Sequence, residues 1–286
     1  MIEKTALVLE GGGFRGAYTA GCMQWLKDHG IDFRYIVSIS ATAVYSFYYA
    51  GDEMEALHDL STRGIIDKHV IGLIPLLNGG TLVGYDYLLE EYVKPVYDRI
   101  LPKLQNSDLK FEVGAYNMTQ QQLQYKKLSD LDPEGQLLKA TCVLPLTGRM
   151  TAVDGNKYLD GGMKTMVSVD RAEEMGYKKQ LVIVTKDKNY VRKPNGWFID
   201  TLMKIVYHNY PVMLETLDHR VDAYYEQMQS VYDKEAKGEA ILIRPSDNCG
   251  VKRFFGTQQQ LEKLFRVGWQ DMEDRRDEIL EFLKEN

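Results

Sequence analysis

The chain has 286 residues, of which 44% are apolar, and a formal net charge of −6 at pH 7. A chain of this length can bury one large core, and its negative charge argues against non-specific binding to nucleic acid. No run reaches the ~18–20 consecutive apolar residues that cross a bilayer, and the first residues lack the basic and apolar regions of a signal peptide. Three widely spaced cysteines without metal-type pairing are typical of reduced thiols. We therefore expect a cytoplasmic protein with no metal site and no nucleic-acid partner.

Residues 5–50 have the spacing of a strand–helix–strand–helix unit. The apolar run at residues 6–9 is typical of a buried strand and stops at three consecutive glycines. Helical spacing follows between Gly16 and Gly30, and glycine is a common helix terminator. A second short strand runs directly into Ser40, and the next ten residues are helical again. This unit predicts the start of a parallel sheet that is covered by helices.

The glycine loop after the first strand permits two chemical interpretations. Gly11, Gly13 and Gly16 match the G-x-G-x-x-G pattern that binds a dinucleotide pyrophosphate at a helix N-terminus. That interpretation also expects an acidic residue at the end of the second strand, where this chain has Ser38-Ile39-Ser40. The missing acid makes dinucleotide binding the less favoured interpretation.

The second interpretation takes the loop and Ser40 together. A serine on a tight strand-to-helix turn projects its hydroxyl above the sheet, at the positive end of the following helix. A glycine loop after the neighbouring strand can direct backbone N–H groups to the same point and form an oxyanion hole. Arg15 would add positive charge or fix the shape of the loop. Without any catalytic role, the glycines would permit close packing and Ser40 would cap a helix.

The motifs Gly11-Gly12-Gly13-Phe14-Arg15-Gly16, the serine turn at Ser40 and Asp160-Gly161-Gly162 together resemble the patatin-like phospholipase family, and more narrowly its bacterial cytoplasmic members. The resemblance covers residues 7 to about 194 and is weaker beyond. It implies a three-layer α/β/α sandwich around a mostly parallel sheet. We expect a single domain over residues 1–286, with a helical C-terminal portion from about residue 197.

The resemblance also implies a function, which is lipid acyl ester hydrolysis by a Ser–Asp dyad without a histidine or a cofactor. By position, Ser40 would be the nucleophile and Asp160 the base. Lipid or lysophospholipid esters would be the substrates, with possible peripheral contact to a membrane; the oligomeric state is left open. The oxyanion hole would be formed by the backbone of the glycine loop, around Gly12, Gly13 and Phe14 within the segment Gly11, Gly12, Gly13, Phe14, Arg15 and Gly16.

The serine turn departs from the family pattern G-x-S-x-G, because Ser38 and Thr42 replace the two glycines. Those glycines let the strand and helix backbones approach closely, and a β-branched residue at the start of a helix is less favourable. The turn would then depend on Ser38, Ala41 and Thr42, and the aspartate on Gly161 and Gly162. A catalytically degenerate acyl-binding or scaffold protein is therefore the first alternative to a hydrolase.

The remaining pattern is that of an α/β chain. Asp154-Gly155 marks a hairpin turn in residues 151–159, whose second strand ends at Asp160. A helix is expected over residues 85–104, kinked or divided by Pro95, and a final amphipathic helix over residues 257–286. Helices are also expected at 53–63 and at 197–238, the latter interrupted at Pro211, and a short helix or loop at 135–142. Further strands are expected at 111–118, 122–128, 180–185 and 240–245.

Two segments have both an ordinary and a functional interpretation. The apolar residues 65–77 are favoured as a connection packed in the core, and alternatively form a flap over the serine that contacts acyl chains or a bilayer. Four basic residues follow the strand expected at 180–185; they are Lys186, Lys188, Arg192 and Lys193. The favoured interpretation is a solvated surface, and the alternative is a binding site for an anionic headgroup. His69, His208 and His219 lie in no motif that indicates a catalytic triad.

Overall fold

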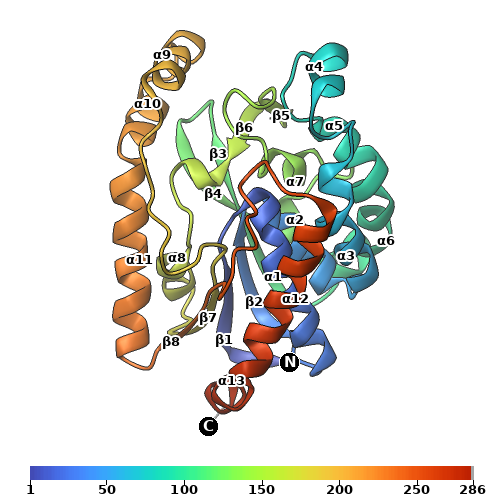
Figure 1. Ribbon diagram of the computed structural model, residues 1–286, viewed down its shortest axis with the longest axis vertical. Helices are drawn as coiled ribbons and strands as arrows, with labels where there is room; N and C mark the ends of the chain where they lie inside the picture. The colour runs from blue at the N-terminus through green and yellow to red at the C-terminus, as the bar shows by residue number, and fades with distance from the viewer. Residues whose placement is uncertain (285–286) are drawn as a thin grey trace.

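The computed structural model describes residues 1–284 and contains one eight-stranded mixed sheet (Figure 1). The sheet order is β5-β6-β3-β2-β1-β7-β8, and β4 also pairs with β3. Strands β3, β2, β1, β7 and β8 run parallel to one another, whereas β4 and β6 pair antiparallel with β3, and β5 pairs antiparallel with β6. The strands are β1 (Ile2–Leu9), β2 (Phe33–Ile39), β3 (Lys110–Asn117), β4 (Gln122–Lys127), β5 (Thr151–Val153), β6 (Asn156–Asp160), β7 (Lys179–Ile183) and β8 (Ala240–Ile243).

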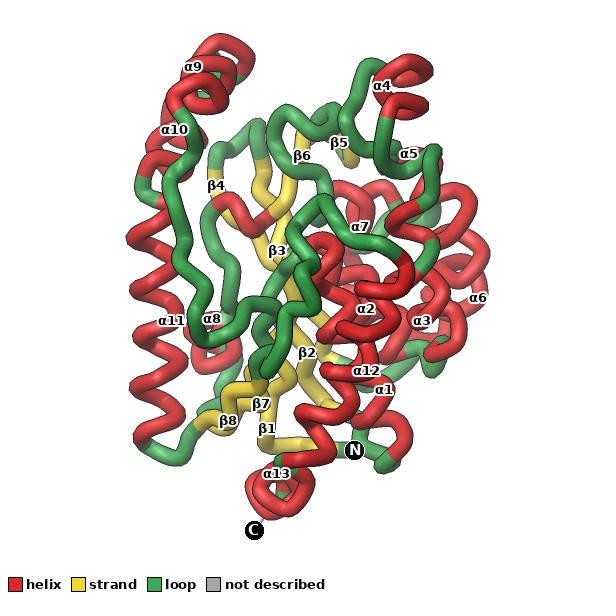
Figure 2. The backbone as a smooth tube through the Cα atoms, in the orientation of Figure 1, coloured by secondary structure: helices red, strands yellow, loops and turns green. Residues whose placement is uncertain are grey.

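Helices cover both faces of the sheet, as the alternation of side chains along β1 shows. Leu7 and Leu9 belong to one large core cluster, and Ala6 and Val8 belong to the second cluster on the opposite face. The second face is covered by α8 (Val169–Glu174) and α11 (Arg220–Ala236). The first face is covered by α1 (Gly16–Asp28), α2 (Ala41–Ala50), α3 (Met54–Thr62), α6 (Lys94–Gln105), α7 (Gln136–Ala140) and α12 (Gln258–Asp274). The predicted three-layer α/β/α sandwich is confirmed (Figure 2).

The edge of β3 brings two distant segments together. Residues 112–117 of β3 pair with β4 along one edge of β3, so the other two partners of β3, which are β2 and β6, pair along its opposite edge. On that edge β2 pairs as far as Gly114, opposite Ile39, and β6 pairs from Ala115, opposite Asp160. Because β2 and β6 approach from opposite directions, the residue after β2 and the last residue of β6 meet. Those two residues are Ser40 and Asp160.

The C-terminal residues return to the same sheet after a helical segment. Helices α9 (Trp197–Val206), α10 (Pro211–Asp218) and α11 precede β8, which pairs with β7 along the edge of the sheet. The predicted single final helix divides at Arg275 into α12 and α13 (Arg276–Leu283), and its last two predicted residues lie outside the described residues. Within residues 1–284, no helix has the length and apolar character needed to cross a bilayer.

Two helical regions differ in detail from the sequence analysis. The helix predicted over residues 85–104 is divided into α5 (Tyr85–Leu88), a π-helical turn at Leu89–Val93 and α6, in which Pro95 lies in the first turn. Proline is tolerated there because the first N–H groups of a helix have no intrahelical partner. Helix α8 had no sequence prediction. The predicted strand pair β3–β4 and the β5–β6 hairpin are confirmed.

Candidate active site

Ser40 occupies a sharp turn between β2 and α2. Its backbone has φ 64° and ψ −137°, a combination that a residue with a side chain rarely adopts. Such strain between a strand and a helix is characteristic of a nucleophile elbow, which raises the serine hydroxyl above the sheet. The turn therefore has the required shape without the two family glycines.

Asp160 lies beside this serine. The Ser40 hydroxyl donates a hydrogen bond to Asp160 Oδ2 at 2.5 Å, and the Gly162 N–H donates to Oδ1 at 2.7 Å. Burial raises the pKa of the Asp160 carboxyl above its usual value, and the opposing influences are these two hydrogen bonds and the nearby charges of Arg220 and Arg253. A buried carboxylate that already holds the serine hydroxyl has the geometry of a general base.

The glycine loop packs directly against the elbow. A Cβ on Gly11 would lie 2.7 Å from Ser40 Cβ and 2.8 Å from the Ile39 carbonyl oxygen, so only glycine permits this approach. Gly13 has φ 57°, and a Cβ there would lie 2.5 Å from the Arg253 carbonyl oxygen. The loop leads through a 3₁₀ turn at Gly13–Arg15 into α1, which begins at Gly16.

The N–H groups of this loop differ in availability. The Phe14 N–H donates to the Arg253 carbonyl at 3.0 Å, so this predicted oxyanion donor is already occupied. In the described chain, the N–H groups of Gly12 and Gly13 donate no hydrogen bond. These two groups are the candidates that remain for an oxyanion hole.

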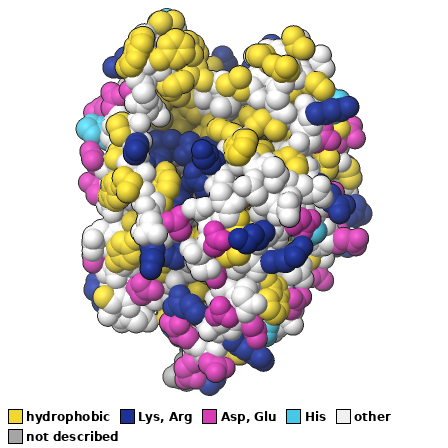
Figure 3. All heavy atoms as spheres, in the orientation of Figure 1, with side chains coloured by type: hydrophobic (Ala, Val, Ile, Leu, Met, Phe, Trp, Pro, Cys, Tyr) yellow, Lys and Arg dark blue, Asp and Glu magenta, His cyan; other side chains and the backbone are white. Residues whose placement is uncertain are grey.

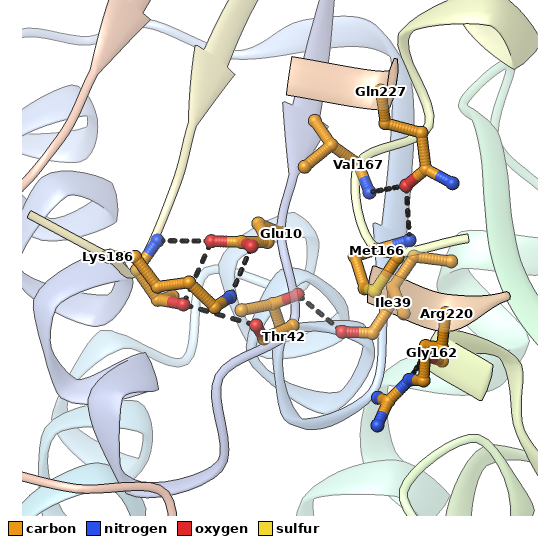
Figure 4. Close-up of polar contacts among 11 residues, drawn as sticks. Glu10, Ile39, Thr42, Gly162, Met166, Val167, Lys186, Arg220 and Gln227 are labelled. Carbon is orange, nitrogen blue, oxygen red and sulfur yellow. Dashed lines mark hydrogen bonds and ion pairs between the residues drawn. The ribbon is translucent and has the colours of Figure 1, made fainter. Parts of the chain in front are cut away.

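The loop is anchored to the end of β7 through a buried carboxylate, Glu10. Lys186 forms an ion pair with Glu10 (Figure 4). The other oxygen of Glu10 accepts hydrogen bonds from the Thr185 N–H at 2.7 Å and from the Thr185 hydroxyl at 3.0 Å. The Thr185 hydroxyl also lies 3.1 Å from the Gly11 carbonyl. This network fixes the loop where it meets the elbow.

The two residues that replace the family glycines are buried and hydrogen-bonded. The Ser38 hydroxyl lies 2.8 Å from the Ser46 hydroxyl on α2. The Thr42 hydroxyl donates to the Ile39 carbonyl at 2.8 Å, across the turn itself (Figure 4). Both side chains thus tie β2 to α2 from within, and the elbow forms with them in place. Ala41, the first residue of α2, lines the pocket described next.

An apolar pocket opens on one side of Ser40. Cys142 and Leu144, which follow α7, contribute to it. Of the apolar segment 65–77, Ile65, Val70 and Ile71 line this pocket. In α4 (Leu73–Gly79), Pro75 is buried, whereas Leu73, Leu76 and Leu77 are exposed. The core interpretation is therefore right for the first half of the segment and wrong for these three leucines. The other lining residues are Gly13, Phe14, Ala41, Val44, Tyr45, Leu60, Val83, Tyr85, Leu88 and Phe254.

Positive side chains line a second side of Ser40, in a separate pocket. Lys186 and Arg192 are buried there, so the favoured interpretation as a solvated surface is wrong for them and right for Lys188 and Lys193. Arg15 also lines this side, with its guanidinium 5.3 Å from the centre of the Tyr190 ring. Figure 3 shows Lys and Arg side chains gathered in a hollow on this face of the molecule.

Two residues of this side had no sequence prediction. Arg220 starts α11 and donates its Nε–H to the Gly162 carbonyl at 2.9 Å (Figure 4). Arg253 lies in the loop before α12. Each is an isolated arginine far along the chain from the motifs, and no local pattern distinguishes it. Within residues 1–284, no histidine lines either of the two pockets that contain Ser40. His69 contacts the carboxylate of Asp67 instead.

Comparison with known proteins gives two family matches, and similarities to a curated protein and to solved structures. The model of a patatin-like phospholipase matches residues 7–172, and the model of a domain of unknown function (DUF6363) matches residues 210–284. The chain is 25% identical over 202 residues to the uncharacterized protein YjjU of Escherichia coli (strain K12), a match over 68% of this chain and 55% of that protein. Its fold is similar to that of VipD from Legionella pneumophila, with a TM-score of 0.52 and 13% identity over 96% of this chain and 67% of that one.

The patatin-like model covers more than half of the sequence, including the glycine loop, the serine elbow and Asp160. The chain spans only about half the length of its curated relative, and the structural likeness concerns the fold. On the family model and the fold together, the protein belongs to the patatin-like phospholipase family.

Proposed function

We propose that the protein is a serine hydrolase of lipid acyl esters, with Ser40 as nucleophile and Asp160 as general base. The observation that carries this proposal is the 2.5 Å hydrogen bond from the Ser40 hydroxyl to Asp160, formed at a strained strand-to-helix turn. The family to which the chain belongs supports the same class of reaction.

In the proposed mechanism, Asp160 accepts the hydroxyl proton while Ser40 Oγ attacks the ester carbonyl. The Gly12 and Gly13 N–H groups stabilise the oxyanion, a contribution of order 10²–10³ in rate per donor. Asp160 then returns the proton to the departing alcohol and leaves an acyl-enzyme. Water attacks this intermediate, again with Asp160 as base, and Asp160 passes the proton to Ser40 Oγ as the bond to the acyl group breaks and the fatty acid leaves. The higher basicity that burial gives to Asp160 favours both proton transfers.

The apolar pocket beside Ser40 supports an acyl chain as the group that is transferred. Its lining is almost wholly hydrocarbon, and it begins at the nucleophile itself. A chain bound there would place its ester carbonyl beside Ser40 and below the glycine loop.

Two exposed apolar helices support contact with a lipid surface. Leu77 on α4 and Trp197 on α9 are each 80% exposed, and both helices project from the same end of the molecule (Figure 1). Figure 3 shows the apolar side chains at both tips, above the basic hollow. Exposed apolar groups of this kind bind the interfacial region of a bilayer.

Vesicle binding tests this contact. We expect Leu77→Ser with Trp197→Ser to reduce co-sedimentation with phosphatidylcholine vesicles, because the apolar side chains no longer enter the interface. The exposed Tyr232, on the far part of α11, provides the control substitution Tyr232→Ser. Equal sedimentation of the double variant and the parent would reject a role for the two tips.

The catalytic proposal is tested with a fluorophosphonate probe, which reacts covalently with an activated serine. We expect the probe to label the parent and not to label Ser40→Ala. The labelling rate of Asp160→Asn should be about 10²- to 10⁴-fold lower than that of the parent, which is the usual effect of losing a general base. Ser129→Ala, at an exposed serine, should label like the parent.

A folded parent that is not labelled would favour the alternative of an acyl-binding or scaffold protein. The double variant Ser38→Gly with Thr42→Gly, which restores the family elbow, would then be tested for labelling. Gain of labelling would assign the inactivity to the elbow.

A further inference from the structure

The pocket on the basic side of Ser40 is lined by five cationic side chains from four separate parts of the chain. Arg15 comes from the glycine loop, Lys186 and Arg192 from the segment after β7, Arg220 from the start of α11 and Arg253 from the loop before α12. Asp160 is the one acidic residue that lines the pocket in the described chain. Apart from Arg15, these cations lie outside the residues matched by the patatin-like model.

Most of these charges have no carboxylate partner. Lys186 pairs with Glu10, and among residues 1–284 the four arginines form no ion pair. Arg192 is 7% exposed, and its Nη1 is buried without a hydrogen-bond partner in the described chain. A buried donor without a partner is costly, and an anion in the pocket would supply the missing acceptor.

The cations also act on one another. Burial, with Arg192 and Arg253 nearby, lowers the pKa of Arg220 to about 9. Burial likewise lowers the pKa of Lys186 to about 8; Arg15 and Arg192 lower it further, whereas Glu10 opposes the change. A multiply charged anion relieves this repulsion and accepts several charge-assisted hydrogen bonds at once.

Ser40 lines both the apolar and the basic pocket, so the two meet at the nucleophile. An ester with its acyl chain in the apolar pocket would extend its alcohol portion into the basic pocket. The pocket offers no free carboxylate for the ammonium group of a zwitterionic headgroup, because Asp160 holds the Ser40 hydroxyl and Glu10 holds Lys186. A terminal phosphate, with up to two negative charges, fits this surplus of positive charge.

We propose that Arg192, Arg220 and Arg253 form a phosphomonoester subsite, which selects acyl esters whose alcohol carries a terminal phosphate. This inference rests on the proposed hydrolase function. It assigns to the region after residue 172 the role of completing the pocket beside Ser40, which itself comes from the N-terminal part of the chain.

Hydrolysis of matched soluble substrates tests the selection. We expect the parent to prefer 1-octanoyl-glycerol 3-phosphate over 1-octanoyl-glycerol. We also expect Arg192→Gln to lower kcat/KM on the phosphorylated ester about 10- to 100-fold, which is the loss expected when one charged hydrogen bond is removed. The matched control is Lys188→Gln, which removes the same charge from the same loop at an exposed position. Equal kcat/KM of the parent on both esters, or equal losses on both in Arg192→Gln, would overturn the subsite.

Binding to Ser40→Ala separates this inference from the hydrolase proposal, because it needs no turnover. We expect glycerol 3-phosphate, and not glycerol, to raise its melting temperature, and the rise to shrink when Arg192→Gln is added. This result would support the subsite even if no ester were hydrolysed. If inorganic phosphate stabilised Ser40→Ala as strongly as glycerol 3-phosphate does, the pocket would be a site for the free anion, and substrate selection would be rejected.

Discussion

The two sides of the candidate site come from different parts of the chain and are built differently. Ser40, Asp160 and the glycine loop lie within the residues that the patatin-like model matches, and backbone geometry fixes their positions. The basic side depends on long side chains from the later part of the chain, of which Arg220 and Arg253 fall in the second matched region. The two proposals thus place the reaction chemistry on the first side and the selection of the substrate on the second, and the charges of Arg220 and Arg253 couple the two sides by lowering the pKa of Asp160.

The first prediction tests how far the reaction depends on backbone geometry. In Gly11→Ala, the new methyl group would lie 2.7 Å from Ser40 Cβ and 2.8 Å from the Ile39 carbonyl oxygen, which is closer than van der Waals contact, so the loop must move away from the elbow. We expect the rate of fluorophosphonate labelling to fall about 10²- to 10³-fold, the loss typical of an oxyanion donor.

The control for this substitution is Gly196→Ala, because a Cβ on Gly196 has no neighbour within 4 Å and its φ of −73° suits any residue. It should label at the parent's rate. Labelling of Gly11→Ala at that same rate, with an unchanged circular dichroism spectrum, would show that close approach of the loop is unnecessary.

The second prediction concerns the acid side of the pH profile. Protonated Asp160 cannot accept the serine proton, so labelling should decrease as the pH falls through its pKa. Because burial raises that pKa, the midpoint should lie above the value of about 3.9 for an unperturbed aspartate. Asp160→Asn should lack this decrease, and a parent midpoint at or below the unperturbed value would contradict the assignment of Asp160.

The third prediction links the two sides of the site. The charge of Arg253 lowers the pKa of Asp160, so Arg253→Gln should move the acid midpoint of labelling to higher pH. Lys252→Gln removes a neighbouring charge at an exposed position and should leave the midpoint in place. Identical midpoints in both variants would mean that the basic side does not influence the base.

The sequence was sufficient for those parts of the site that depend on short motifs. Three consecutive glycines after a strand, Ser40 at a strand end and a hairpin ending at Asp160 each have a local signal. The approach of β2 and β6 along β3 followed only from the family resemblance, because 120 residues separate Ser40 and Asp160.

The basic side could not be predicted from the sequence in the same way. Burial of Lys186 and Arg192 depends on α11 and on the loop before α12, which approach only in the folded chain. A run of basic residues has the same composition whether it is solvated or buried, and Arg220 and Arg253 belong to no run at all. Tertiary contacts decided these positions.

The elbow shows a different limit, because the sequence revealed the altered residues but not how they fit. The Thr42 side chain takes part in the turn, since its buried hydroxyl donates to the Ile39 carbonyl. We therefore expect Thr42→Val, which keeps the shape and removes the donor, to lower the free energy of unfolding by about 1 kcal/mol in chemical denaturation. Thr201→Val removes a hydroxyl bonded to the Trp197 carbonyl at an exposed position on α9 and should have almost no effect, because water replaces the lost partner. Equal, negligible changes in both variants would mean that Thr42 merely fills the space left by the family glycine. A selective loss in Thr42→Val would show that this chain stabilises its elbow with a side-chain hydrogen bond where the family pattern has a glycine.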